Sequence, residues 1–168
     1  MFYPADLTTT LHSIPWFVDL DQKRLERLAQ ITELMEVKAN QTLFCEGEKD
    51  AYVYVVLEGK IAVDMVVPSR GSVRIFVAEP LDILGWSSLT PVVRQRTATA
   101  LALTCSRVAA INTTALQRLC DEDARLGYVI MRRISNVVAS RLLTTRLQLL
   151  DLIAEPSQDE KPGKSYSE

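Results

Sequence analysis

The hydrophobic pattern changes twice along the chain and so divides it into three regions. In residues 5–30, apolar side chains such as Leu25 and Leu28 recur at helical spacing between charged ones. Residues 32–112 instead contain short alternating or wholly apolar runs, which turn residues separate. Helical spacing returns after this region and continues to about residue 153. We therefore predict helices on both sides of a central β region.

The central region contains eight short runs with the alternation and β-branched content of strands. Polar turns such as Glu46-Gly47-Glu48 separate neighbouring runs. Many short strands at even spacing are typical of closed antiparallel folds. We predict an α+β, mainly β fold, in which an eight-stranded double-stranded β-helix (jelly roll) over about 32–112 is flanked by N-terminal helices and a long C-terminal helix. The predicted strands are Glu33–Val37, Gln41–Cys45, Tyr52–Leu57, Lys60–Val66, Ser72–Val77, Leu81–Leu84, Thr97–Leu103 and Arg107–Ile111.

Polar residues mark where the C-terminal helices begin. Asn112 is a plausible N-cap for a short helix. Asp121-Glu122-Asp123 then places negative charge at the start of a long helix over about 124–153. We expect residues 5–153 to form one domain. Residues 154–168 are Pro, Ser, Gly and charge, and we expect a disordered tail there.

The long helix carries more apolar surface than one small roll covers. Val138, Leu142, Thr145 and Leu149 follow the 4-3 spacing of a coiled-coil seam, and further leucines flank them. We expect these four residues to form the contact of a homodimer, since cyclic dimers are the commonest oligomers. The alternative is one broad apolar face that lies on the domain's own core.

Composition narrows the class of protein. The chain is 48% hydrophobic and 24% charged with a formal charge of −2, so its overall charge gives no reason to expect nucleic-acid binding. No apolar run is long enough to span a bilayer, and three cysteines without a CxxC pair suggest neither a disulfide framework nor a zinc site. We expect a cytoplasmic protein with no membrane partner.

A single histidine, His12, excludes much catalytic chemistry. Metal sites built on imidazoles need several histidines, and Ser-His or Cys-His devices need one beside the nucleophile. The predicted roll contains none, which argues against a metal-dependent jelly-roll enzyme. We therefore predict no metal site, no catalytic residues and no enzymatic activity.

One segment of the roll has the features of an anion site. Gly85 permits a sharp turn after a strand, and Ser87 and Ser88 open what reads as one helical turn. Arg96 follows eleven residues after the glycine and begins the next predicted strand, where its guanidinium could bind the same anion. The alternative is a tight loop with a surface arginine.

The chain resembles the cyclic-nucleotide-binding domain of the catabolite activator protein (Crp/Fnr) family over about residues 10–150. Leu43-Phe44-Cys45-Glu46-Gly47-Glu48 is similar to the family's apolar-x-x-x-Gly-Glu turn, and Tyr54–Ile61 to its strand-glycine-strand hairpin. Gly85 to Arg96 has the spacing of the family's phosphate cassette, in which a helical turn and an arginine hold the cyclic phosphate. The ligand-binding residues that this resemblance implies are Gly85, Trp86, Ser87, Ser88, Arg96, Thr97, Thr144 and Thr145.

The chain departs from the family's pattern at Trp86, where the family has a glutamate that accepts the ribose 2′-hydroxyl. Losing this charge-assisted hydrogen bond costs about ten- to a hundredfold in affinity. The indole could instead stack on a ligand or occupy the sugar space itself. On the long helix, Thr144 and Thr145 could bond a base edge or their own helix carbonyls.

A further departure follows the long helix, where the family has a DNA-reading helix-turn-helix and this sequence has a polar tail of fifteen residues. We expect no direct DNA binding. The sequence favours a stand-alone module that binds cyclic AMP, cyclic GMP or another small phosphorylated ligand and signals through its dimerising helix to an unidentified partner protein. The alternative is an interaction protein whose vestigial pocket is plugged by Trp86.

Overall fold

A computed structural model describes residues 4–49, 51–90 and 95–154. The chain divides into two compact units, Met1–Ile134 and Ser135–Glu168, which we describe separately. The predicted disorder of residues 154–168 lies outside the described residues, apart from Ala154, which ends a helix.

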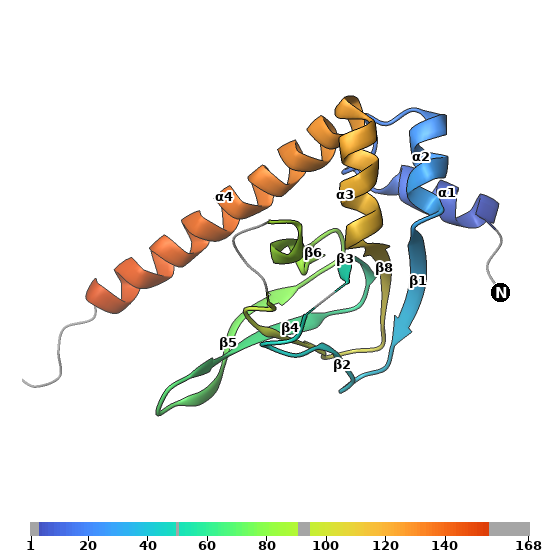
Figure 1. Cartoon of the computed structure of the whole chain (residues 1–168). Helices are drawn as coiled ribbons and strands as arrows, with labels where there is room; N and C mark the ends of the chain where they lie inside the picture. Colours follow the sequence, from blue (N-terminus) through green and yellow to red (C-terminus); the bar gives the residue numbers. More distant parts are fainter. Residues whose placement is uncertain (1–3, 50, 91–94, 155–168) are drawn as a thin grey trace, which may run out of the picture. The chain divides into compact units, whose positions relative to one another are not determined.

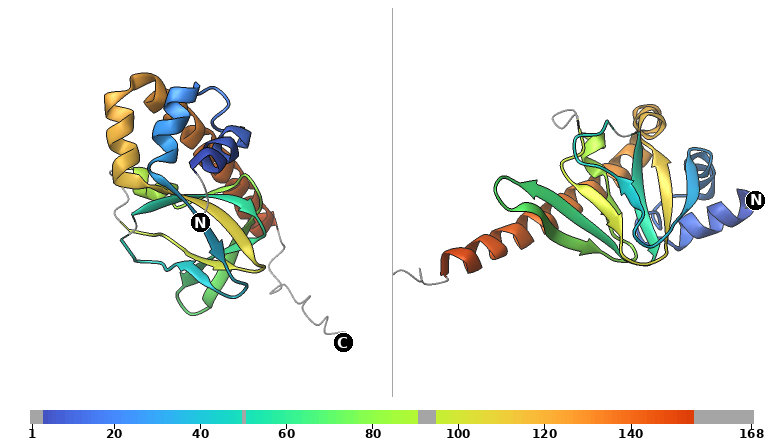
Figure 2. Two further views of the ribbon diagram at one scale, coloured as in Figure 1. Left: turned by 90° about the vertical axis from the view of Figure 1, so that its right-hand side faces the viewer. Right: turned by 90° about the horizontal axis from the view of Figure 1, so that it is seen from below.

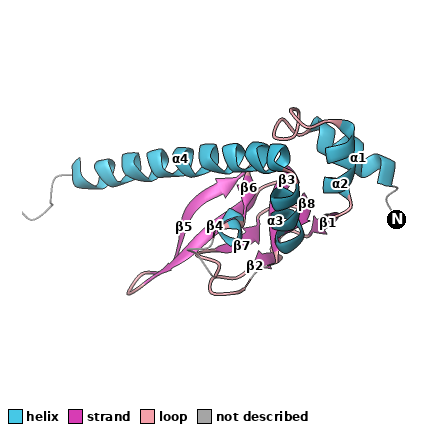
Figure 3. Ribbon diagram, turned by 45° about the horizontal axis from the view of Figure 1, so that its top comes forward, coloured by secondary structure: helices cyan, strands magenta, loops and turns pink. Residues whose placement is uncertain are grey.

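The first unit contains the predicted eight-stranded jelly roll (Figures 1 and 3). All strand pairs are antiparallel, and they form two four-stranded sheets in the orders β1-β8-β3-β6 and β2-β7-β4-β5. This confirms the predicted fold class. The strands are β1 (Thr32–Val37), β2 (Thr42–Phe44), β3 (Tyr52–Glu58), β4 (Ile61–Val67), β5 (Gly71–Ala78), β6 (Ile83–Leu84), β7 (Thr99–Ala102) and β8 (Ser106–Asn112).

Helices precede and follow the roll, as predicted. The N-terminal pair is α1 (Pro4–Ser13) and α2 (Gln22–Ala29), and α3 (Thr113–Glu122) follows β8. The Asn112 side chain accepts a hydrogen bond from the N–H of Ala115, which confirms it as the N-cap of α3. Helices α2 and α3 lie side by side (Figure 2). Arg27 of α2 pairs with Glu122 of α3.

Contrary to the sequence prediction, the long helix does not begin with Asp121 and Glu122. Helix α4 spans Ala124–Ala154, whereas Asp121 and Glu122 belong to the last turn of α3. Only Asp123 caps α4, because one of its carboxylate oxygens accepts from the N–H groups of Arg125 and Leu126 at 3.1 Å each. The negative charge therefore acts at a break between two helices, not along the first turn of one.

The central strands β8 and β3 of the sheet β1-β8-β3-β6 are packed on both faces. Strand β3 shows this by alternation: Val53 and Val55 belong to a cluster with α1, α2 and the first turns of α4, which we call the helix-side cluster. Tyr54 and Val56 belong to a second cluster between the two sheets, which we call the roll interior. Successive strand residues point to opposite faces, so neighbouring residues of β3 reach different clusters.

The second unit holds α4 from Ser135 onward. Many of its described apolar side chains are exposed, among them Val138 (37%), Leu142 (51%) and Leu149 (55%). None of the described helices has the length and apolarity needed to cross a bilayer.

Candidate functional site

A left-handed turn at Gly85 joins β6 to a short 3-10 helix, η1 (Trp86–Leu89). The backbone φ of Gly85 is 73°, a region that side-chain-bearing residues rarely adopt. A Cβ at this position would also lie 2.6 Å from Cζ of Arg96. The guanidinium of Arg96 therefore occupies the space that only glycine leaves open, and the two predicted residues meet directly.

Arg96 is buried in the roll interior, with 3% of its surface exposed. Its guanidinium carbon lies 4.2 Å from the ring centre of Phe44 and 5.7 Å from that of Tyr54. Its Nη2 donates a hydrogen bond to the carbonyl oxygen of Tyr52. The two rings are themselves stacked, with centres 5.8 Å apart. Aromatic faces attract a cation, so they hold the guanidinium within the roll.

The backbone of Arg96 is held by the turn that follows β2. Its N–H donates to the carbonyl of Glu48 at 2.9 Å, and its carbonyl accepts from the N–H of Gly47 at 2.8 Å. The prediction that Arg96 begins a strand is wrong, because β7 begins only at Thr99. Backbone hydrogen bonds to this turn, and not to a neighbouring strand, therefore fix the position of Arg96.

Burial lowers the pKa of Arg96 to about 10, and the negative charge of Glu48 opposes this shift. The guanidinium therefore remains charged at neutral pH. Burial also raises the pKa of Tyr54 to about 12, with smaller contributions from Tyr52 and Glu48. The roll interior thus holds the Arg96 cation beside neutral aromatic rings, a setting that attracts an anion.

Trp86 lies on the other side of the sheet from these rings. It is half-buried and packs against the helix-side cluster, as does Leu89 at the end of η1. The indole is therefore accounted for by packing under the helices. Phe44 and Tyr54 are among the residues that line Arg96 within the roll.

The hydroxyl groups of the turn have partners inside the protein. Ser88 Oγ donates to the carbonyl of Gly85 at 2.8 Å and lies 3.2 Å from Oγ1 of Thr113. Ser87 is buried, and Thr97 is exposed. Of the predicted residues, Gly85 and Arg96 are in direct contact, with Ser88 bonded to the same turn.

The threonines of α4 belong to the second unit and are exposed. Thr144 Oγ1 donates to the carbonyl of Ser140 at 3.1 Å, and Thr145 Oγ1 to that of Arg141 at 2.9 Å. These are the bonds to their own helix that the sequence left open as an alternative. Their predicted contact with a ligand stays a prediction.

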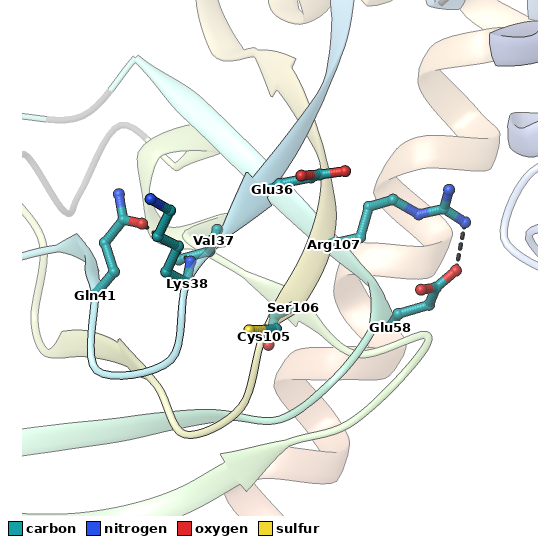
Figure 4. Close-up of a pocket in the computed structure, with 8 residues that line it drawn as sticks. All are labelled: Glu36, Val37, Lys38, Gln41, Glu58, Cys105, Ser106 and Arg107. Carbon is teal, nitrogen blue, oxygen red and sulfur yellow. Dashed lines mark hydrogen bonds and ion pairs between the residues drawn. The ribbon is translucent and has the colours of Figure 1, made fainter.

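A cavity of about 720 Å³ lies at the end of the sheet where β1, β3 and β8 meet the connecting turns (Figure 4). Arg107 pairs with Glu58 at 2.5 Å at one side of the cavity, and Glu36 stands opposite Arg107 in the strand register. None of the predicted ligand residues lines it. Its mixture of acids and bases presents no single charge to a ligand.

Three residues near Arg96 escaped the sequence analysis: Phe44, Tyr54 and Glu48. Alternation could have indicated the two aromatic residues, because each occupies an inward position of its strand. Glu48 carries no such signal, since its approach to Arg96 depends on how a turn meets a segment 48 residues away.

The fold defines a jelly-roll domain flanked by helices, with a buried arginine beside a glycine turn. The sequence model of the "Cyclic nucleotide-binding domain" family matches residues 34–123, which is more than half of the chain. The chain belongs to this family.

Solved structures with the same fold include a cyclic nucleotide-binding domain from Methylobacillus flagellatus, with a TM-score of 0.74 and 20% identity over 89% of this chain and 83% of that one. The N-terminal domain of a transcriptional regulator from Streptomyces coelicolor is 29% identical, with a TM-score of 0.62 over 81% of this chain and 94% of that one. Uncharacterized NTE family proteins from Mycobacterium tuberculosis and Mycobacterium bovis are 42% identical over 56 residues. This segment is 33% of this chain and 10% of those proteins, so the chain spans only a small part of their length.

Proposed function

We propose that this domain is a regulatory module that binds a cyclic nucleotide or another small phosphorylated ligand through Arg96. The observation that carries the proposal is the contact between the charged, buried guanidinium of Arg96 and the turn at Gly85. A buried cation is costly unless a negative group compensates it, and a phosphate oxygen is a suitable partner for a guanidinium. Membership of the cyclic nucleotide-binding family supports the same ligand class.

Binding requires Arg96 to exchange internal contacts for ligand contacts. With 3% of the residue exposed, a phosphate reaches the guanidinium only if the turn at Gly85 or the turn at Glu48 shifts. The stacking on Phe44 and the bond to the Tyr52 carbonyl compete with the ligand. We therefore expect weak binding of cyclic AMP, and Trp86 adds to this expectation because an indole N–H cannot accept a ribose hydroxyl.

We further propose that α4 passes the signal on by forming a homodimer. Val138, Leu142, Thr145 and Leu149 lie along one line of the helix, and the three apolar members are 37–55% exposed. Each Å² of apolar surface that two paired helices remove from water stabilises the pair by about 25 cal/mol. The receiver of the signal is a partner protein in this proposal.

A second candidate is a domain that keeps the fold and binds no ligand. The observation in its favour is that Arg96 has internal partners in Tyr52, Phe44 and Tyr54. Under this alternative, Arg96 is a structural residue, and the pocket is filled by its own side chains. Trp86 is not the plug, because it packs on the helix side.

Titration calorimetry separates the two candidates. The native chain is titrated with cyclic AMP, cyclic GMP and inorganic phosphate, beside an Arg96→Lys variant and an Arg74→Lys control. Arg74 is an exposed arginine paired with Asp64, so its replacement tests the loss of a guanidinium elsewhere in the roll. We expect phosphate-bearing ligands to bind the native chain and the control, and to bind Arg96→Lys at least tenfold more weakly. No binding to the native chain selects the ligand-free alternative.

A further inference from the structure

The turn Cys45–Glu48 brings a carboxylate to the Arg96 site. The turn exchanges two backbone hydrogen bonds with Arg96, and Glu48 itself accepts one of them. The side chain of Glu48 folds back over the turn, where its Oε2 accepts from the N–H of Cys45 at 2.9 Å. Its negative charge opposes the lowering of the Arg96 pKa by burial. Burial raises the pKa of Tyr54 and of Cys45, and the charge of Glu48 adds to both shifts.

We propose that Glu48 is a specificity-determining residue of this site, which selects a singly charged anion that carries a hydroxyl donor. This inference rests on the proposed function. Arg96 supplies the positive partner for the anion, and an ionised carboxylate can only accept hydrogen bonds. A ligand that bridges Arg96 and Glu48 must therefore present a negative group and, close to it, a hydrogen-bond donor.

The charge of Glu48 also limits the charge of the ligand. Each additional negative charge on the ligand is attracted by Arg96 and repelled by Glu48. A phosphodiester carries one charge, whereas a phosphomonoester or sulfate carries about two. The pair therefore favours the diester, and a hydroxyl beside it gains a charge-assisted hydrogen bond.

The carboxylate has an oxygen available for this bond. Oε2 of Glu48 is engaged by Cys45, and within the described part of the chain Oε1 has no hydrogen bond. Glu48 is exposed, so a ligand hydroxyl can reach it without displacing a buried group. Trp86 offers no competing acceptor, because its indole is a donor only.

The same turn provides a matched control in Glu46. Its Oε2 accepts from the N–H of Val66 on β4 at 2.9 Å, which directs this carboxylate to a neighbouring hairpin. Both acids are exposed and lie two residues apart in one turn. Replacing Glu48 or Glu46 removes one negative charge in either case, but only Glu48 lies in the position proposed for ligand selection.

The test is titration calorimetry of the full chain with cyclic AMP and with its 2′-deoxy analogue. In the native chain and in Glu46→Gln we expect the hydroxyl to strengthen binding by about tenfold or more. In Glu48→Ala the two ligands should bind equally, and Glu48→Gln should lie between, since an amide oxygen still accepts. Sulfate gives a second measurement, for which Glu48→Gln should bind about fivefold more tightly than native.

The outcomes distinguish this inference from the proposed function. If both nucleotides bind and Glu48→Ala keeps the native preference for the hydroxyl, Glu48 does not determine specificity, while Arg96 still binds phosphate. If Glu46→Gln weakens the preference for the hydroxyl as much as Glu48→Gln does, the effect is one of net charge, and the inference is wrong. If neither nucleotide nor sulfate binds the native chain, the proposed function and the inference are both rejected.

Discussion

Arg24 of α2 and Asp123, the residue between α3 and α4, form a two-point ion pair although they are 99 residues apart. Arg24 Nε donates to Asp123 Oδ2 at 2.8 Å, and Nη2 donates to Oδ1 at 3.2 Å. The same carboxylate caps α4. The Asp123 side chain thus fixes the first turn of α2 against the start of the long helix.

This pair predicts acid sensitivity. The hydrogen bond from Arg24, followed by the backbone N–H of Leu126, holds the pKa of Asp123 below its ordinary value. A carboxyl whose pKa is lowered by folding stabilises the protein above its unfolded pKa of about 3.9, and this contribution is lost as the pH falls through the folded value. We expect Asp123→Asn to melt at a lower temperature than native at pH 6, and the gap to close towards pH 2. A gap that stays constant down to pH 2 would contradict this origin of the stability.

Gly85→Ala should destabilise the roll by more than about 2 kcal/mol, since it adds backbone strain and displaces the guanidinium of Arg96. Gly47→Ala is the matched control. Gly47 has a φ of 85°, and a Cβ there meets nothing within 4 Å, so only strain of about 1 kcal/mol is expected. Urea unfolding of both variants measures the difference. Equal losses would show that Arg96 does not press on Gly85.

Trp86→Glu should lower the free energy of unfolding by about 2–4 kcal/mol, because it places a carboxylate against the helix-side cluster. Trp86→Phe keeps an apolar ring there and should cost less than about 1.5 kcal/mol. Thermal melts of the two variants at neutral pH give the comparison. If Trp86→Glu is as stable as the native chain, the indole does not pack under the helices.

Leu142→Glu should convert dimers to monomers in sedimentation velocity experiments. Leu142 is 51% exposed, so the substitution leaves the fold of a single chain intact, while a charge in the proposed seam opposes pairing. Ser140→Glu is the control, because two helical positions turn a side chain by about 200° away from that seam. If dimers persist in Leu142→Glu, the dimer contact does not include this residue. If dimers are lost in both variants, the loss is not specific to the proposed seam.

Most of the fold could be predicted from the local pattern of apolar and polar residues, and β3 shows why. Val53 and Val55 face the helices while Tyr54 and Val56 face the roll, and this alternation is present in the sequence as an apolar run bounded by turns. The N-cap of α3 was equally predictable, because Asn112 needs only the next three residues to make its bond.

The arrangement of side chains inside the site could not be predicted from local sequence pattern. The direction of Trp86 follows a left-handed residue, and such a turn breaks the alternation that assigns faces within a strand. The environment of Arg96 depends on contacts with Phe44 and Glu48, about fifty residues earlier in the chain. The spacing from Gly85 to Arg96 indicated a meeting of the two residues but not the depth of its burial.

The contact between Ser88 and Thr113 gives the turn at Gly85 a connection beyond the roll. Thr113 is the first residue of α3, its N–H is bonded to the carbonyl of Ala51, and α3 leads through Asp123 to α4. A ligand that repositions Ser88 withdraws a hydroxyl partner from the first turn of α3. Under the proposed function, a ligand in the roll would therefore alter a contact at the start of α3, and the two hydroxyl groups would couple the ligand site to the C-terminal helices.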